Sequence, residues 1–178
     1  MAFWLIEIVD AFILGGWLDR FGIMPRALVG LRGILFAPFL HGGWGHLMAN
    51  TVPFLFLGWL VMLQRTKDFW LVTLYAAAVG GTGVWLFGQP RSIHIGASML
   101  VFGYLGFLLF RGYFQRDSTS ISIAVLAGVL YGGMIFGTLP IQAGVSWEGH
   151  LFGFIGGALA ARWLSRRSRR VPSNRSGW

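Results

Sequence analysis

The chain has 178 residues, of which 56% are hydrophobic, 16% aromatic and only 11% charged, and its mean hydropathy is +0.67. A soluble domain carries roughly 25% charged residues, so this composition argues against a water-soluble protein, and the apolar content excludes a disordered chain. The absence of cysteine excludes disulfides, a thiolate zinc site and a cysteine nucleophile. We therefore expect an all-α membrane protein.

Six apolar runs are candidates for membrane spans, because a helix needs about 20 mostly apolar residues to cross the hydrocarbon core. They are bounded by charges, prolines and glycine clusters. In chain order they cover 2–18, 43–63, 69–87, 96–110, 121–138 and 147–164. The first run lacks a basic start and holds Glu7 and Asp10, so we interpret it as a retained span rather than a signal peptide. The two acids share a helix face and are expected to anchor this span to the bundle.

The distribution of basic residues predicts the orientation. Six crossings place both chain ends on one side, and ten of the fourteen basic residues then lie on that side. The four on the other side are Arg20, Arg26, Arg32 and Arg91. Cytoplasmic loops carry the excess of Lys and Arg, so both termini should be cytoplasmic. We divide the chain into a membrane domain, 1–164, and a basic disordered tail, 165–178, which should contact anionic lipid rather than nucleic acid.

The second span begins with polar residues, which are costly inside a membrane and therefore candidates for function. His46 and Asn50 are four residues apart and project from one helix face, whereas His41 lies nearer the outer boundary. Hydrogen-bond donors of this kind can stabilise the oxyanion that forms during acyl transfer. A backbone N–H at a helix N-terminus can do the same.

Two other spans each provide one reactive side chain. Ser98 follows Gly96 at the start of the fourth span, and His150 shares a face of the sixth with Gly153. Small residues let membrane helices approach closely, so Ser98 and His150 can come within hydrogen-bond reach, although the glycines could also serve packing alone. Neutral imidazole is the usual base for a serine nucleophile. No carboxylate is placed to orient His150, which favours a dyad, and Phe102, one turn after Ser98, could stack on the imidazole.

Taken together, these residues resemble the rhomboid intramembrane serine proteases of the bacterial type. The matching features are HxxxxHxxxN, which contains His41, His46 and Asn50, the GxS that ends at Ser98, and the final His150 in HLFGFIGG. Their order and spacing cover nearly the whole chain. The resemblance implies a six-transmembrane-helix rhomboid-like bundle that hydrolyses peptide bonds in or near the transmembrane segments of client proteins. It implies no cofactor and no metal.

The resemblance also implies a role for each matching position. Ser98 would be the nucleophile, and His150 would be its general base and later the acid for the leaving amine. Two residues would help form the oxyanion hole: His46 and Asn50. Four would support the site: His41 in the outer loop, Gly96, Phe102 against the catalytic histidine, and Gly153.

One position departs from the family's usual GxSG, because Met99 follows Ser98. Glycine after the nucleophile permits close backbone approach. Methionine could narrow the substrate pocket, lower the activity, or be tolerated through its flexibility. The alternative hypothesis is therefore a weak or inactive rhomboid-like protein that binds membrane clients. Inactive members of the family typically lack the serine or the histidine, whereas Ser98 and His150 are both present here.

Other functions fit the sequence less well. A transporter would need polar residues along a path, and an inverted repeat, which we do not find, would support it. A zinc site of His41, His46 and His150 would leave Ser98 idle, and the chain has no HExxH motif. His94 is read as an interfacial or capping residue.

A client helix must be partly unwound before its carbonyl can reach Ser98. We therefore expect clients with Gly, Pro or polar residues near the outer end of their span and a small residue before the cut. The expected location is the bacterial inner membrane. The sequence specifies neither the client nor the oligomeric state.

Overall fold

The computed structural model describes residues 2–142 and 144–170, and within these ranges every regular element is a helix. The α-helices are α1 (Ala2–Val9), α2 (Gly33–Phe36), α3 (Trp44–Gln64), α4 (Thr66–Phe87), α5 (Ser98–Gln115), α6 (Ser118–Tyr131) and α7 (Trp147–Arg170). A π-helical turn (Asp10–Leu14) extends α1, and short 3-10 helices cover Trp17–Phe21, Leu28–Arg32, Ala37–Phe39 and Gly132–Thr138. The expected all-α class is confirmed for the described residues.

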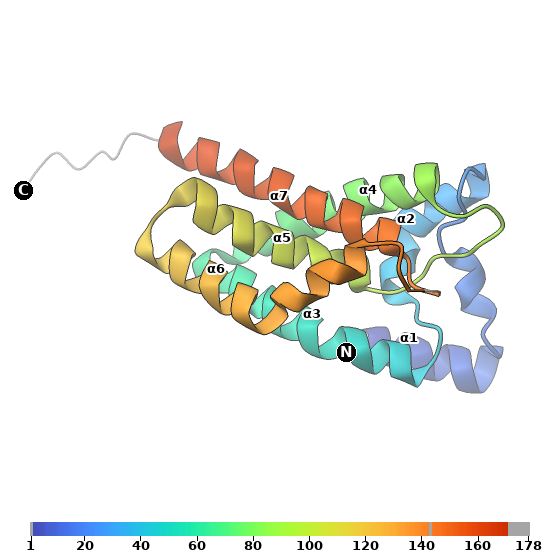
Figure 1. Cartoon of the computed structure of the whole chain (residues 1–178). Coiled ribbons are helices and arrows are strands. Elements are labelled where there is room, and N and C mark those ends of the chain that lie inside the picture. Colours follow the sequence, from blue (N-terminus) through green and yellow to red (C-terminus); the bar gives the residue numbers. More distant parts are fainter. Residues whose placement is uncertain (1, 143, 171–178) are drawn as a thin grey trace, which may run out of the picture.

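Helix α5 lies at the centre of the bundle. It contacts α3, α4, α6 and α7, and in Figure 1 it runs between α7 and α6. Its side chains are almost entirely buried, with Tyr104 and Phe107 fully enclosed. A helix surrounded on all sides by other helices gives its first residue, Ser98, a fixed position at one end of the bundle.

Glycines explain how closely α5 and α7 pack. A side chain at Gly157 would collide with the carbonyl of Gly103, and one at Gly106 would collide with the carbonyl of Phe154. These positions bring the two backbones into direct contact, as small residues do in membrane bundles. The close approach expected from the sequence is present along the shared length of the two helices.

The first expected span, 2–18, is not one continuous helix. Helix α1 ends at Val9, the π-helical turn follows, and the chain then reaches Gly15 and Gly16, both with positive φ. Two successive left-handed residues stop a right-handed helix. The resulting segment is shorter than the roughly 20 residues of a full crossing.

The two acids of this first segment each accept a backbone hydrogen bond. Glu7 is buried and accepts from the N–H of Gly43, directly before α3, over 3.1 Å. Asp10 is buried and accepts from the N–H of Leu18 over 2.9 Å. Glu7 therefore anchors α1 to the bundle, as the sequence predicted, whereas Asp10 closes the turn that follows α1.

Three helices are apolar and long enough to cross a bilayer: Trp44–Leu63, Thr66–Phe87 and Ser118–Thr138, the last formed by α6 and the 3-10 helix after it. Within the described residues, the other expected crossings do not meet both the length and the composition required. Helix α7 also extends beyond its expected end at 164 and continues to Arg170, so part of the segment expected to be disordered is helical. The rest of that tail, 171–178, lies outside the described residues.

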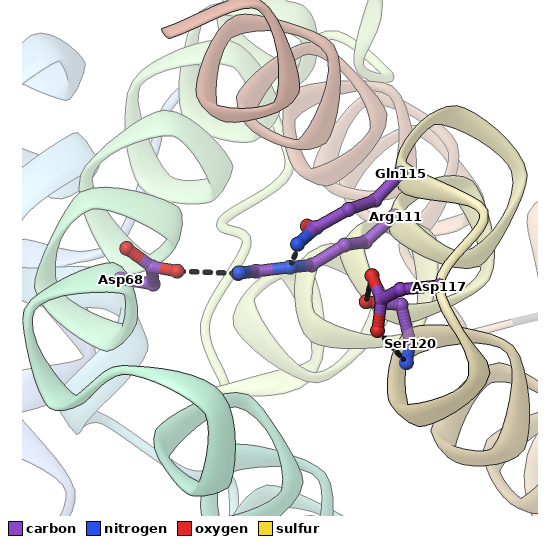
Figure 2. Close-up of polar contacts among 5 residues, drawn as sticks. All are labelled: Asp68, Arg111, Gln115, Asp117 and Ser120. Carbon is purple, nitrogen blue, oxygen red and sulfur yellow. Dashed lines mark hydrogen bonds and ion pairs between the residues drawn. The ribbon is translucent and has the colours of Figure 1, made fainter. Parts of the chain in front are cut away.

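A buried ion pair holds α4 and α5 together at the end of the bundle far from Ser98. Figure 2 shows the Arg111 guanidinium directed at the Asp68 carboxylate, and the Arg111 Nε also donates to Gln115 over 2.9 Å. Nearby, Asp117 caps α6 by accepting from the N–H of Ser120 over 2.9 Å. Hydrogen bonds from the Ser120 backbone and hydroxyl hold the pKa of Asp117 below its usual range.

Candidate active site

The start of α5 is fixed by the loop that precedes it. Gly96 has a φ of +114°, a conformation that favours glycine, and its N–H donates to the carbonyl of Ala37 over 2.9 Å. The N–H of Ala97 donates to Nε2 of His41 over 3.4 Å. Ser98 follows directly as the first residue of α5, and its backbone N–H is one of the helix-terminal amides that lack an intrahelical acceptor.

The His41 side chain is buried against this loop and is not exposed to solvent. It is 2% exposed and packs against the rings of Phe3 and His46. Burial, and then the proximity of His46, lowers the pKa of His41 to about 4. The ring is therefore neutral at pH 7, and a neutral ring nitrogen can accept the Ala97 hydrogen bond. His41 therefore contacts the residue next to Ser98.

His46 faces the same loop from the first turn of α3. Its Nδ1 accepts from the N–H of Gly42 over 3.3 Å. Because an amide N–H can only donate, Nδ1 is the acceptor, and the proton of a neutral ring resides on Nε2. A Cβ at Gly96 would lie 2.6 Å from that Nε2. Glycine at 96 is therefore required for space as well as for its backbone conformation.

Asn50 lies one helical turn further along α3. It is 5% exposed, and its Nδ2 donates to the carbonyl of His46 over 2.9 Å. An amide nitrogen carries two hydrogens, so one donor remains after this bond. The arrangement locks the Asn50 side chain on the helix face that carries His46.

The His150 ring is held from two sides. Its Nδ1 lies 2.8 Å from the carbonyl of Gly137, and its plane stacks on Phe102 with 4.1 Å between ring centroids and 8° between planes. Because a carbonyl can only accept, Nδ1 carries the proton and Nε2 of the neutral ring keeps a free lone pair. The expected stack with Phe102 is present.

The chain brings the regions of Ser98 and His150 together through backbone packing. A Cβ at Gly153 would collide with the carbonyl of Met99, so α7 touches α5 one residue after Ser98. Phe102, which stacks on His150, lies one turn after Ser98 on α5. Among the described residues no hydrogen bond joins Ser98 to His150. Catalytic hydrogen bonds are often long in unliganded sites and tighten only around a substrate.

Met99 lies in the hydrophobic core. Its side chain is 4% exposed. A Cβ at Gly80 of α4 would lie 3.3 Å from the Met99 Cβ, so glycine provides the space that methionine uses. The bulk at position 99 is therefore accommodated in the core where α4 meets α5.

Gly137 was not among the site residues expected from the sequence. It belongs to the 3-10 helix after α6 and contributes a backbone carbonyl, so its residue type carries no chemical signal. A Cβ there would lie 3.1 Å from Cζ of Phe102 and 3.3 Å from Nδ1 of His150. A glycine at the end of the fifth apolar run, in a chain with a base but no orienting carboxylate, is the faint signal that was available.

The candidate residues lie within a recognised domain. The family model for the rhomboid domain matches residues 30–167, a range that contains Ser98, His150 and the residues around them. The chain belongs to the rhomboid family. Rhomboids are intramembrane serine proteases, so this protein is assigned to the hydrolases at the family level. Together with its apolar helices, membership makes this rhomboid an integral membrane protein.

The relatives of this rhomboid are bacterial and eukaryotic. An uncharacterized protein of Mycobacterium tuberculosis is 43% identical over 176 residues, covering 94% of this chain and 73% of the relative. The Bacillus subtilis protein YdcA, named as a candidate rhomboid protease, is 30% identical over 128 residues, covering 67% of this chain and 60% of the relative. Rhomboid-like protease 5 of Toxoplasma gondii is 28% identical over 161 residues, covering 82% of this chain and 19% of its own.

Proposed function

We propose that this rhomboid is an active serine endopeptidase that cuts membrane-protein clients with a dyad of Ser98 and His150. The observation that carries the proposal is the fixed orientation of His150. Its Nδ1 is occupied by the Gly137 carbonyl and its face by Phe102, so its basic Nε2 is the nitrogen left for a serine hydroxyl. In this arrangement a backbone carbonyl replaces the carboxylate of a triad.

His150 carries its ring proton on Nδ1 and His46 carries its proton on Nε2, so the first can accept a proton at Nε2 and the second can donate a hydrogen bond from Nε2. His150 takes the Ser98 hydroxyl proton at Nε2 while Ser98 Oγ bonds to the scissile carbonyl carbon. The developing oxyanion accepts hydrogen bonds from Nε2–H of His46, the second amide hydrogen of Asn50 and the N–H of Ser98. His150 then protonates the leaving amine, and water hydrolyses the acyl-enzyme with His150 again acting as base.

The proposed topology has six crossings with both termini in the cytoplasm of a bacterial cell. Besides the three apolar membrane-length helices, the crossings would be α5, α7 and the short segment formed by α1 and its π-helical turn. In Figure 1 the α5–α6 connection, which contains Arg116, lies at the same end of the bundle as the arginine-rich end of α7. Anionic lipid would meet this end.

The topology can be tested directly because the chain contains no cysteine. Single cysteines at Gln89 and Arg116 would lie at opposite ends of the bundle. A membrane-impermeant maleimide should label Gln89→Cys in cells with a permeable outer envelope, and should label Arg116→Cys only after the inner membrane is lysed. Equal labelling of both before lysis would contradict the orientation.

The client preference follows from the mechanism. Hydrolysis at Ser98 needs an extended carbonyl, so clients with helix-breaking residues near the outer end of their span should be cut best. Replacing those residues by Leu in a client should slow cleavage by this rhomboid, whereas equal cleavage of both clients would contradict the requirement for unwinding.

The decisive experiment is labelling with a fluorophosphonate, which reacts with an activated serine. We expect the parent protein to be labelled and both Ser98→Ala and His150→Ala to be unlabelled while remaining folded. An unlabelled but folded parent protein would refute the proposed activity and favour the alternative, a rhomboid-like protein that binds clients without cutting them.

The variant Met99→Gly tests whether methionine at this position obstructs the proposed protease site. Because the Met99 side chain fills core space beside Gly80, its removal should lower the thermal stability and leave the labelling rate unchanged or reduced. Large-to-small changes in a core typically cost about 2–5 kcal/mol. A labelling rate that rises in Met99→Gly would indicate instead that methionine obstructs the site.

A further inference from the structure

His94 joins the two segments that lead to Ser98 and His150. Its ring lies between two hydroxyl groups, with Nδ1 2.6 Å from Oγ of Ser146 and Nε2 2.7 Å from Oγ of Ser92. Ser146 stands directly before α7, and His94 lies in the connection between α4 and α5. One side chain therefore connects the N-terminal ends of the helices that carry the proposed dyad.

The direction of these hydrogen bonds follows from their partners. The Ser92 hydroxyl donates to the carbonyl of Gln89, so its oxygen must accept from the Nε2–H of His94. Nδ1 of the neutral ring then accepts from the hydroxyl of Ser146. Burial lowers the pKa of His94, which agrees with a neutral ring. The bond that reaches α7 is thus the one at Nδ1.

The backbone around His94 is equally constrained. Its N–H donates to the carbonyl of Ile23 and its carbonyl accepts from the N–H of Ile23, each over 2.9 Å. On the other side of the bridge, the carbonyl of Ser146 accepts from the N–H of His150 over 3.1 Å. The hydroxyl of Ser146 is therefore bound by His94 while its carbonyl caps the turn that carries His150.

We propose that His94 is a positioning residue of this protease, one that fixes the start of α7 relative to the start of α5 through Ser146. His94 lies four residues before Ser98 in the connection that leads into α5, and Ser146 lies four residues before His150, directly before α7. The bridge therefore joins the two segments that lead into these helices. His94 acts through the helices rather than on the reacting atoms. The inference rests on the proposed dyad.

The substitutions His94→Asn and His94→Gln, which both introduce a side-chain amide, test this role. In His94→Asn the side-chain oxygen can occupy the region of Nδ1 and accept from Ser146, whereas the longer His94→Gln places its amide near the region of Nε2, toward Ser92. We expect His94→Ala and His94→Gln to be labelled by a fluorophosphonate about 10-fold to 100-fold more slowly than the parent, since small misplacements of catalytic groups cost up to about 10²-fold. His94→Asn should recover most of the rate.

The serines provide matched controls. Ser146→Ala removes the same bond from the other side, so it should slow labelling as much as His94→Ala, and the double variant should be no slower than either single one. Ser92→Ala loses the bond that does not reach α7 and should have a smaller effect. Ser98→Ala measures any labelling at other serines, including Ser146.

The kinetic form of the defect distinguishes positioning from misfolding. A displaced dyad lowers the maximal inactivation rate while the labelled fraction at completion and the half-saturating probe concentration stay unchanged. A misfolded protein lowers the labelled fraction instead. If the parent is labelled and His94→Ala reacts at the parental rate, or His94→Asn is as slow as His94→Gln, the positioning role is wrong. An unlabelled parent would refute the dyad itself, and the positioning role with it.

Discussion

The contact between Gly137 and the His150 ring leads to a quantitative prediction. A Cβ at Gly137 would lie 3.1 Å from Cζ of Phe102 and 3.3 Å from Nδ1 of His150. Both separations are below ordinary van der Waals contact, so Gly137→Ala must shift the stacked rings by a few tenths of an ångström. That shift lengthens the 2.8 Å bond that sets the tautomer of His150.

The size of the effect follows from that one bond. A protein hydrogen bond contributes about 1 kcal/mol net, and about 1.4 kcal/mol corresponds to tenfold in rate. Gly137→Ala should therefore reduce kcat/KM toward a transmembrane client about fivefold. Gly137→Val, whose branched side chain cannot be accommodated by so small a shift, should be nearly inactive.

Gly133 provides the control. It lies in the same 3-10 helix, and a Cβ there would have no neighbour within 4 Å. Gly133→Ala should cleave clients at the parental rate and have the same thermal stability. Equal activities for Gly137→Ala and Gly133→Ala would refute the view that the Gly137 carbonyl orients the base.

Three further outcomes can be measured on the purified protein. Asn50→Ala should lower the fluorophosphonate labelling rate by about 10²–10³, the typical effect of one oxyanion donor, and an unchanged rate would exclude Asn50 from the site. Asp68→Leu leaves Arg111 buried without its partner and should lower the free energy of unfolding by about 3–5 kcal/mol, whereas Asp68→Leu combined with Arg111→Met should regain most of it in denaturant titrations. Burial, with Asp10 and Glu7 nearby, raises the pKa of Asp19 to about 6, so its ionisation destabilises the fold as pH rises from about 4 through about 6. Asp19→Asn should therefore raise the Tm at pH 7 to 8 and leave it unchanged below pH 4, and a gain at both pH values would rule out titration as the cause.

The sequence predicted those parts of the fold that depend on residue type. The apolar runs predicted α3, α4 and the start of α7 closely. The glycines of α5 and α7 predicted that these two helices are in contact. The sequence predicts too long a first span, because hydropathy is insensitive to the left-handed backbone conformations of Gly15 and Gly16. The sequence places the end of α7 too early, because a basic run after 164 indicates disorder even though Lys and Arg are good helix formers.

The candidate site divides in the same way. Side chains with distinctive chemistry, such as His46 and His150, can be identified as candidate site residues from the sequence. The groups that orient them are the N–H of Gly42 and the carbonyl of Gly137, and every residue has such groups. The direction of the Met99 side chain could not be predicted either, because it depends on the space left by Gly80 in a distant helix.

The carbonyl at Gly137 has a consequence for the electrostatic self-energy of the site. An ionised carboxylate beside His150 would be a full charge in a medium of low dielectric constant, where solvation of a lone anion is lost at a cost of several kcal/mol or more. A backbone dipole orients the same imidazole with no net charge. In the proposed mechanism the resting site is then neutral, and charge would appear only as an imidazolium and an oxyanion that form together. Such a site can be held within a bilayer without a permanent counter-ion.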